Sequence, residues 1–580
     1  MKILLTTLNA KYVHTSLALW YLYQFCKKDH SGLVLREFNI NQDLSWVCGE
    51  IYLEQADVVA FSCNIWNIEQ VLIICRRLKA VAPDTVIILG GPEAAADPRE
   101  TLAANPAVDF IVCGEGELTF AEWLRELKQS VPRWENISGL AFRSGQGIPV
   151  LNEPRPVIPD LALLPFPYPR EDLAQFRQKL VYYETSRGCP YHCSYCLSAN
   201  EREVRCFPMD RVEQELLLLI EAGIAQVKLV DRSFNCNPER AKHIWRFLLA
   251  HPGHTNFHFE IVGDLLDEES LAILAAAQPG QFQFEIGVQS TNEETLRLID
   301  RKMDFARLGD RVIRLRRQGR IFVHLDLIAG LPGEDYQSFA KSFNDNMTLA
   351  PSRLQLGFLK LLKGSGLREQ AADFGYEFTA ETPYEVLENN WISYRELLNL
   401  KVIEDLLERY YNSGRFERGF GYLMTRYSSP FQLFEALASW WKGRGYDQVS
   451  HREKDLYRYL IEFYPAEGTE GVILRNLLKH DLLRSERMVE LPDWAGAITP
   501  ELRRFSFDFW RNPSNREQFL PELAGLEIRD IQRRVLFGEF DLDPEATWAA
   551  IKEGTPQPER KPCIYLFVYG GGTAKTYKVG

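Results

Sequence analysis

The chain has 580 residues, a formal net charge of −12 and 46% hydrophobic residues. This length exceeds what one hydrophobic core supports, so we expect about three or four domains. The acidic balance disfavours a nucleic-acid partner, and no apolar run approaches the roughly 20 residues that span a bilayer. The first residues turn polar at Thr6 without a signal-peptide core. We therefore expect a cytoplasmic protein whose cysteines stay reduced.

Residues 1–145 alternate short apolar strands with amphipathic helices. Strands are predicted over residues 1–7, 56–62, 85–89 and 110–113, and helices over 15–26, 68–82 and 98–105. This alternation predicts an α/β fold with a doubly wound, Rossmann-like parallel sheet. A ligand of such a sheet binds at the carboxyl ends of the strands.

Polar and glycine-rich turns follow these strands. Glycines there let the backbone approach a large flat ligand closely, although a plain tight turn explains each Gly-Gly pair as well. The candidate ligand-binding positions in these turns are Asn9, Ser62, Asn64, Gly90, Gly91, Gly114, Glu115 and Gly116.

Residues 146–180 contain seven prolines and predict an extended linker. After it, residues 181–372 alternate strands and helices again. Strands are predicted over residues 181–185, 226–230, 258–261, 282–288, 322–328 and 354–361. Their carboxyl ends are the expected place for a site.

Three cysteines follow the first strand of this second region. Cys189, Cys193 and Cys196 have the spacing C-x3-C-x2-C, with Tyr195 before the last cysteine. Three thiolates can hold three corners of a [4Fe–4S] cube, which leaves one iron open. A zinc site completed by His192 is the alternative, but no second cysteine pair accompanies it.

This cysteine run resembles the signature of the radical S-adenosylmethionine (SAM) superfamily. The resemblance implies a partial TIM barrel and an open iron that SAM chelates. The run Glu285-Ile286-Gly287-Val288-Gln289-Ser290 resembles the fourth-strand pattern of that family. By the same resemblance, candidate SAM-binding residues are Asp231, Glu260, Gln289, Ser290, Arg301, Ile328 and Gly330.

Two of these assignments carry alternatives. Asp231 also fits the cap of a following helix, and Glu260 could simply face solvent or pair with an arginine. The usual glutamate of the fifth-strand motif falls on Gly333 here, with Glu334 one residue later. That shift leaves the role of Glu334 open.

Residues 1–145 resemble a cobalamin-binding domain, on the runs Ile-Leu-Gly-Gly-Pro-Glu and Val-Asp-Phe-Ile-Val-Cys-Gly-Glu-Gly-Glu. The Asp-x-His-x-x-Gly motif, whose histidine ligates cobalt in many such domains, is absent from the sequence. If cobalamin binds, its lower face therefore lacks this histidine.

Residues 373–580 predict a mostly helical domain with an aromatic core. A substrate pocket or a cap over the barrel is the alternative interpretation. The sequence indicates no function for this extension.

Together these resemblances imply a cobalamin-dependent radical SAM enzyme that cleaves SAM at a [4Fe–4S] cluster and modifies an unactivated carbon, with methyl transfer as the expected outcome. A methylthiotransferase-like enzyme, a cyclase or rearrangement enzyme, and a non-catalytic cobalamin-binding sensor or scaffold are the alternatives. The expected partners are a small-molecule or peptide substrate and an external electron donor of the flavodoxin or ferredoxin kind.

Overall fold

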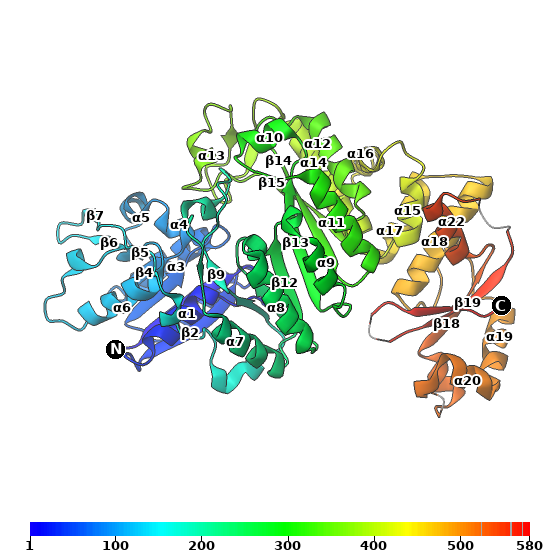
Figure 1. Cartoon of the computed structure of the whole chain (residues 1–580), viewed down its shortest axis with the longest axis horizontal. Helices are drawn as coiled ribbons and strands as arrows, with labels where there is room; N and C mark the ends of the chain where they lie inside the picture. The colour runs from blue at the N-terminus through cyan, green and yellow to red at the C-terminus, as the bar shows by residue number, and fades with distance from the viewer. Residues whose placement is uncertain (524, 557–559, 571) are drawn as a thin grey trace. The chain divides into compact units, whose positions relative to one another are not determined.

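The computed structural model describes residues 1–523, 525–556, 560–570 and 572–580. Its contacts divide the chain into two compact units, Met1–Leu397 and Leu398–Gly580. The first unit holds both an N-terminal sheet domain and a barrel (Figure 1). The domain boundaries expected at residues 145, 180 and 372 therefore stay predictions.

The N-terminal domain is built on a seven-stranded sheet in the order β2-β1-β3-β4-β5-β6-β7. Its strands are β1 (Ile3–Asn9), β2 (Leu33–Asn39), β3 (Val58–Ser62), β4 (Val86–Gly90), β5 (Phe110–Val112), β6 (Leu140–Arg143) and β7 (Pro149–Leu151). The first five are parallel; at one edge β6 pairs antiparallel with β5, and β7 pairs antiparallel with β6. This is the predicted doubly wound sheet, whose order reverses between β1 and β3.

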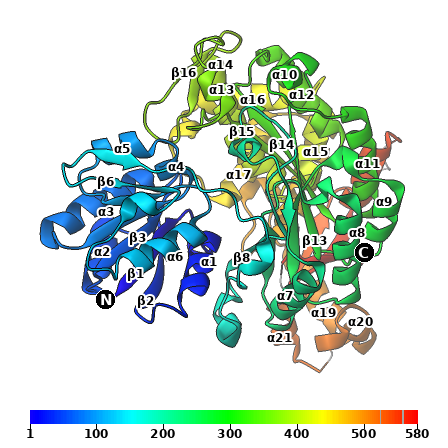
Figure 2. The same ribbon diagram turned by 60° about the vertical axis from the view of Figure 1, so that its left-hand side comes forward.

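Helices cover both faces of this sheet (Figure 2). They are α1 (Leu17–Cys26), α2 (Leu44–Leu53), α3 (Ile68–Val81), α4 (Pro92–Ala95), α5 (Pro98–Ala104) and α6 (Gly116–Glu126). The core has two layers: α2, α3 and α5 pack on one face and α1 and α6 on the other. Because both faces are covered, β1 and β3 are buried along their whole length.

Two strands depart from the predicted pattern. β2 mixes apolar and charged residues, so its amino-acid pattern does not predict a strand. β7 begins at Pro149, inside the stretch expected to be only a linker. Proline is tolerated at that point because it starts an edge strand, where its missing N–H costs no ladder hydrogen bond.

The barrel is a six-stranded parallel sheet in the order β15-β14-β13-β12-β11-β8. Its strands are β8 (Leu180–Tyr183), β11 (Gln226–Leu229), β12 (Asn256–Ile261), β13 (Phe282–Gln289), β14 (Phe322–Ala329) and β15 (Arg353–Phe358). The strands β8 and β15 do not pair with each other, so the barrel is open, as predicted.

Helices cover the outer face of the barrel. They are α7 (Met209–Glu221), α8 (Pro238–Ala250), α9 (Glu268–Leu274), α10 (Glu293–Leu298), α11 (Phe305–Gln318) and α12 (Tyr336–Thr348). Burial alternates along β13, with the apolar residues completely buried and the polar residues between them partly exposed. The inner face of the barrel is therefore polar, and that face carries the candidate site.

Short elements close the first unit. They are β9 (Ser186–Arg187), β10 (Arg205–Cys206), α13 (Gly366–Glu369), β16 (Glu377–Phe378) and β17 (Val386–Glu388). Helix α14 (Tyr394–Leu407) crosses the boundary between the two units.

The second unit is mostly helical, as predicted, and also holds a small antiparallel sheet. Its strands are β18 (Val535–Phe540), β19 (Cys563–Val568) and β20 (Lys575–Lys578). Its α-helices are α15 (Glu417–Met424), α16 (Pro430–Gly443), α17 (Glu453–Phe463), α18 (Gly468–Ser485), α19 (Pro500–Arg511), α20 (Pro513–Phe519), α21 (Ile528–Gln532) and α22 (Pro544–Glu553).

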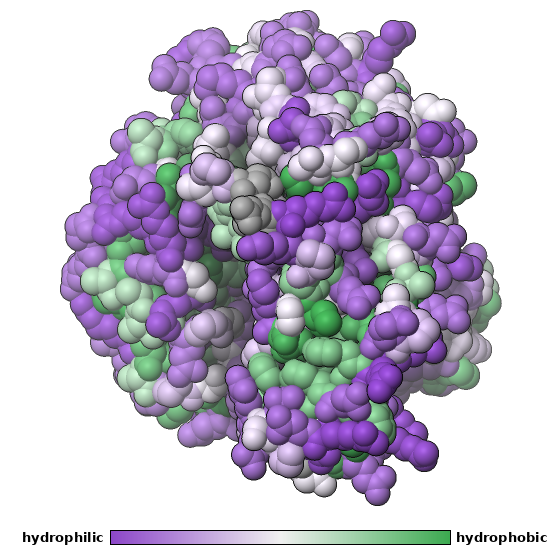
Figure 3. All heavy atoms as spheres, turned by 90° about the vertical axis from the view of Figure 1, so that its right-hand side faces the viewer, coloured by the Kyte–Doolittle hydropathy of each residue, from purple (hydrophilic) through white to green (hydrophobic). Residues whose placement is uncertain are grey.

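The aromatic residues of the second unit lie mainly in its interior. Tyr410, Phe420 and Trp441 are almost fully buried and contact one another, which supports the expected aromatic core. Figure 3 shows hydrophobic side chains gathered in one area of the face that lies to the right in Figure 1. Among the described helices of the whole chain, none is long and apolar enough to cross a membrane.

Candidate functional site

The three-cysteine loop is anchored by backbone hydrogen bonds at several points. The amide of Cys189 donates to the carbonyl of Glu201 at 2.8 Å, and the amide of Ser194 donates to Ile299 at 3.0 Å. Ser194 in turn accepts from the amide of Leu367 at 2.8 Å. The loop is therefore held in place by protein contacts alone, and two of them come from residues more than 100 positions further along the chain, Ile299 and Leu367.

Gly188 lets the chain enter this loop. Its φ is +95°, and a Cβ there would lie 2.1 Å from the carbonyl oxygen of Glu203. Only glycine fits such a contact. The pair of strands β9 and β10 flanks the loop on the same side.

All three cysteines line one cavity of about 240 Å³. Cys189 and Cys193 are buried, and Cys196 is partly exposed. The cavity is bounded by the ends of β12, β13 and β14 and by the loop itself. Its other polar or aromatic lining residues are Tyr191, Tyr195, Ser198, Arg232, Ser233, Glu260, Glu285, Gln289, Arg301, Lys302 and Asp326.

Charged and polar donors face two of the thiols. Arg301 Nη1 lies 3.7 Å from Cys193 Sγ and 3.3 Å from the hydroxyl of Tyr195. Burial raises the pKa of the Cys193 thiol, and the nearby Arg301 guanidinium opposes that rise. Ser233 Oγ lies 3.6 Å from Cys189 Sγ. Three convergent sulfurs with cationic compensation have the donor chemistry that an iron–sulfur cluster requires, so these residues fit the predicted group.

Asp231 lies outside the cavity. It is 1% exposed and accepts hydrogen bonds from the amide and hydroxyl of Thr185, at 2.9 and 2.7 Å. The cap of the following helix α8 is Asn237, which excludes the alternative role. Asp231 thus fixes the segment that leads from β8 into the cysteine loop.

Gln289 faces the cavity from a strained position. Its φ is +71°, and the register of β13 against β14 shifts between Gly287 and Gln289. This bulge re-aims the side chain, whose buried Oε1 has no hydrogen-bond partner among the described residues. Gly287 permits the arrangement, because a Cβ there would lie 2.3 Å from Gln289 Nε2. An orphaned buried carbonyl oxygen beside the thiols fits a ligand that donates hydrogen bonds.

Ser290, Ile328 and Gly330 do not line the cavity. Ser290 is fully buried and donates to Glu334 Oε1 at 2.6 Å, and Ser342 donates to the same oxygen at 2.7 Å. The carbonyl of Gly330, whose φ is +91°, accepts hydrogen bonds from Tyr376 and Asn389. These contacts brace the loop that follows β14.

Glu260 lines the cavity and is paired with a lysine, which the sequence did not indicate. Lys228 Nζ lies 3.0 Å from Glu260 Oε1 and 2.9 Å from Glu285 Oε2. His258 Nε2 lies 2.9 Å from the same Glu285 oxygen. The sequence does contain a pattern that could have predicted this group. His258 and Glu260 are two positions apart within β12, and such residues point to the same face of a sheet.

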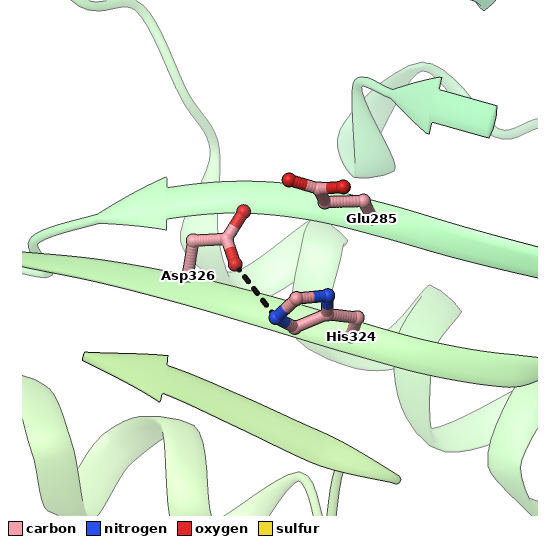
Figure 4. Close-up of side chains that lie close together, drawn as sticks. All are labelled: Glu285, His324 and Asp326. Atoms are coloured by element: carbon pink, nitrogen blue, oxygen red, sulfur yellow. Dashed lines mark ion pairs between the residues drawn. The ribbon is translucent and has the colours of Figure 1, made fainter. Parts of the chain in front are cut away.

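His324 and Asp326 continue this group on β14 (Figure 4). His324 Nε2 lies 3.0 Å from Asp326 Oδ1, and Glu285 faces the pair from β13. Burial and the nearby Glu285 and Glu260 raise the pKa of Asp326, which His324 partly opposes. The inner face of the barrel therefore carries a dense group of ionisable side chains.

The predicted cobalamin-binding residues gather at the carboxyl edge of the N-terminal sheet. Asn9 ends β1, Ser62 ends β3 and Asn64 follows it, on either side of the point where the strand order reverses. Asn67, which the sequence interpretation missed, organises this edge: its buried Nδ2 lies 3.1 Å from Thr7 Oγ1 and from two backbone oxygens.

The two glycine turns at this edge differ. Gly91 has φ +97°, and a Cβ there would lie 2.4 Å from the carbonyl of Cys63, so its turn is packed against protein. Gly114 has φ +73° with open space where a Cβ would stand, and Gly90 and Gly116 sit in ordinary contact distance of neighbours. Glu115 is engaged elsewhere, since it pairs with Arg187 and Arg205 at 3.1 and 2.9 Å.

Large apolar side chains are exposed at the same edge. Tyr12 and Val13 follow β1, and Trp66 follows β3; they are 72%, 43% and 47% exposed. Large apolar groups exposed after the carboxyl ends of parallel strands, where such sheets bind their ligands, favour a binding surface. This edge therefore fits a large, flat, partly apolar ligand such as a corrin.

Three family models match separate parts of the chain. The B12 binding domain matches residues 3–124, the radical SAM superfamily matches residues 183–345, and a protein family of unknown function, DUF4080, matches residues 372–560. The chain thus joins a B12-binding domain to a radical SAM domain and adds an extension without an assigned function.

Two curated relatives each match about half of the chain or less. A 2-(S-pantetheinyl)-carbapenam-3-carboxylate methyltransferase of Streptantibioticus cattleyicolor is 28% identical over 49% of this chain and 44% of its own length. An anaerobic magnesium-protoporphyrin IX monomethyl ester cyclase of Synechocystis is 29% identical over 43% of this chain and 51% of its own. The chain therefore spans about half the length of these relatives or less.

A solved structure supports the fold over a longer stretch. The cobalamin-dependent S-adenosylmethionine radical enzyme OxsB, with aqua-cobalamin bound, covers 83% of this chain with a TM-score of 0.58 and 13% identity. The alignment also covers 79% of that chain, so the two proteins share a fold over most of their lengths.

Proposed function

We propose that this chain is a cobalamin-dependent radical SAM enzyme that modifies an unactivated carbon by methyl transfer. The observation that carries the proposal is the single cavity onto which Cys189, Cys193, Cys196 and the orphaned oxygen of Gln289 all open. The family models and the named methyltransferases support it.

The cofactors would be a [4Fe–4S] cluster, SAM and cobalamin. Cys189, Cys193 and Cys196 would hold the cluster, and Glu260, Gln289 and Arg301 would contact SAM in the cavity. When bound, the cluster supplies the electron that cleaves SAM, and cobalamin supplies the methyl group. The turns of the N-terminal sheet at Asn9, Ser62, Asn64, Gly90, Gly114 and Gly116 would hold cobalamin.

The chain's own residues position and shield the reactants. Arg301 lies beside the buried Cys193 thiol and would balance the negative charge of coordinated thiolates. Asp231 fixes the entry to the cysteine loop, and the Ser290–Glu334–Ser342 group braces the loop after β14. A rigid, half-enclosed site keeps reactive groups oriented and limits access of water.

We further propose a small-molecule or peptide substrate and an external flavodoxin-like or ferredoxin-like electron donor in the cytoplasm. A single C-x3-C-x2-C run supports an external donor, since a second run of that spacing is absent from the sequence. The reducing cytoplasm keeps such thiols available for iron.

The test is anaerobic reconstitution of the full chain with iron, sulfide and hydroxocobalamin, followed by SAM and a reductant. We expect 5′-deoxyadenosine from the wild type and at least a 100-fold lower yield from Cys193→Ala. SAM labelled in its methyl group and an extract of cells that lack the gene should give a labelled small product.

Each part of the proposal can fail separately. Equal 5′-deoxyadenosine from wild type and Cys193→Ala would overturn SAM cleavage. A wild type that retains no corrinoid would overturn cobalamin dependence. A substrate-dependent product without the label would replace methyl transfer with the cyclase class, which the cyclase relative represents.

A further inference from the structure

Six ionisable side chains meet on the inner face of the barrel, beside the cavity. They come from four neighbouring strands, β11 to β14, and are Lys228, His258, Glu260, Glu285, His324 and Asp326. The group holds three carboxylates and one ammonium. With neutral imidazoles it would carry two uncompensated negative charges in a mostly buried place, which is costly.

Lys228 satisfies only part of this group. Its ammonium lies between Glu260 Oε1 and Glu285 Oε2, at 3.0 and 2.9 Å. No contact from Lys228 to Asp326 is found among the described ion pairs and hydrogen bonds. The negative charge that remains therefore lies toward Asp326 and the second oxygen of Glu285.

The two histidines approach carboxylates without forming proper hydrogen bonds. His324 Nε2 and Asp326 Oδ1 are 3.0 Å apart, yet within the described part of the chain neither atom has a well-aligned hydrogen-bond partner. His258 Nε2, 2.9 Å from Glu285 Oε2, is in the same condition. Both histidines are more than nine-tenths buried. In the His324–Asp326 pair the imidazole nitrogen and the carboxylate oxygen thus lie close together without satisfying each other, which leaves both atoms able to bind a third group.

A metal ion accounts for such an arrangement. One ligand atom each from Glu285, His324 and Asp326 lie within 4.8 Å of one another. Ligands about 2.0–2.2 Å from an ion stand roughly 3–4 Å apart, so small side-chain adjustments would close the set. Figure 4 shows the three side chains facing one another from β13 and β14.

We propose that Glu285, His324 and Asp326 bind one first-row divalent cation, with its open positions toward the cavity. One imidazole with two carboxylates suits Mn²⁺, Fe²⁺ or Zn²⁺. A divalent charge cancels the two uncompensated carboxylates. Glu285 and Asp326 both line the cavity, so the ion would take an oxygen donor of the substrate, such as a carboxylate or hydroxyl. This site stands independently of the cofactors proposed above.

The test uses the full chain with Cys189, Cys193 and Cys196 replaced by alanine, so that the thiols of that loop hold no metal. Anaerobic titration with Mn²⁺, followed by the electron paramagnetic resonance signal of free Mn²⁺, gives the affinity and the stoichiometry. We expect one Mn²⁺ per chain, and at least tenfold weaker binding after His324→Gln with Asp326→Asn. The matched control is His243→Gln with Glu213→Gln, an ion pair on the outside of the barrel.

Lys228→Gln gives an independent measurement that does not depend on the loss of a ligand. Removing the ammonium beside Glu285 should tighten Mn²⁺ binding several-fold, since like charges repel. Absent or non-stoichiometric Mn²⁺ binding, unchanged affinity in the His324/Asp326 variant, or weaker binding in Lys228→Gln would each overturn the site. In those cases the negative charge of the three carboxylates is compensated by Lys228 and by protonated histidines, without a metal ion.

Discussion

At the level of single residues, a carboxylate near a cofactor loop can act by holding the loop. Asp231 was predicted to contact SAM, but its oxygens are used by Thr185, at the end of the strand that enters the cysteine loop. Ser290 is likewise turned toward Glu334 and away from the cavity. Both residues would shape the site from behind it.

Asp231→Ala should therefore lower iron binding as well as stability. It removes the acceptor of two buried donors, which costs about 1–3 kcal/mol each when left unsatisfied. We expect the reconstituted variant to hold less than half of the wild-type iron, measured per folded chain. The control is Asp43→Ala, which removes a helix cap far along the chain from this loop and costs about 1 kcal/mol. Full iron occupancy in Asp231→Ala would contradict the positioning role.

Glu334 adds a pH dependence to stability. Burial raises the pKa of this carboxyl from 4.5 to about 7. The folded chain thus holds the proton more tightly than the unfolded chain, so this contribution is complete below pH 4.5 and is lost as the pH rises through 7.

Glu334→Gln should remove that loss, because glutamine stays neutral. Between pH 5 and pH 8 the wild type should lose up to about 3 kcal/mol more than the variant. Thermal unfolding midpoints at the two pH values measure the difference, with the exposed Glu100→Gln as the control. Parallel pH profiles for wild type and Glu334→Gln would show that the carboxyl titrates alike in both states.

At the level of elements, the turns at the carboxyl edge of the N-terminal sheet differ in role: one is packed against protein, and another has open space beside it. Gly91 is needed because its turn touches the backbone of Cys63, whereas the space beside Gly114 is open. An alanine at Gly114 would fill space that a ligand could use. The same substitution at Gly147, which also has positive φ and open surroundings, lies in the turn between β6 and β7.

Gly114→Ala should lower corrinoid retention, whereas Gly147→Ala should not. Both substitutions place alanine at positive φ and should cost about 1 kcal/mol in stability, so the comparison isolates the ligand. Absorption spectra of the purified chains after reconstitution with hydroxocobalamin measure the retained corrinoid. If both variants retained equal amounts of corrinoid, the turn at Gly114 would not be part of the cobalamin site.

The elements that the sequence predicts well are those with one clear physical signal. Within the predicted strand at residues 56–62, residues 58–61 are all apolar because β3 is covered on both faces, and the cysteine spacing is local. β2 was missed because Arg36 and Glu37 interrupt its pattern. The partners of Asp231 and Ser290 lie 46 and 44 residues away. No local pattern encodes such distant contacts, so these side chains were assigned to a ligand.

At the level of the whole molecule, the sheet domain and the barrel of the first unit are joined by buried charge. Glu115 accepts from Arg187 and Arg205, and Arg205 also donates to the carbonyl of Ile158 at 2.6 Å. The side chains of Glu115 and Arg205 are 9% and 5% exposed. Tyr384, which lies between β16 and β17 of the first unit, donates a further hydrogen bond to Glu93 of the sheet domain.

Glu115→Ala should loosen this junction because it leaves two buried guanidinium groups without their shared carboxylate. Breaking a buried pair costs about 3–5 kcal/mol, whereas the more exposed pair of Glu122 with Arg155 should cost about 1 kcal/mol or less. Limited proteolysis within residues 146–180 is the measurement: cleavage should accelerate at least tenfold in Glu115→Ala and stay near wild type in Glu122→Ala. Equal cleavage rates would mean that the junction does not depend on this carboxylate.

The arginines hold the pKa of Glu115 below its usual range. The wild-type junction should therefore keep its strength down to about pH 4.5 and weaken as the pH falls further, because the carboxylate then takes up a proton.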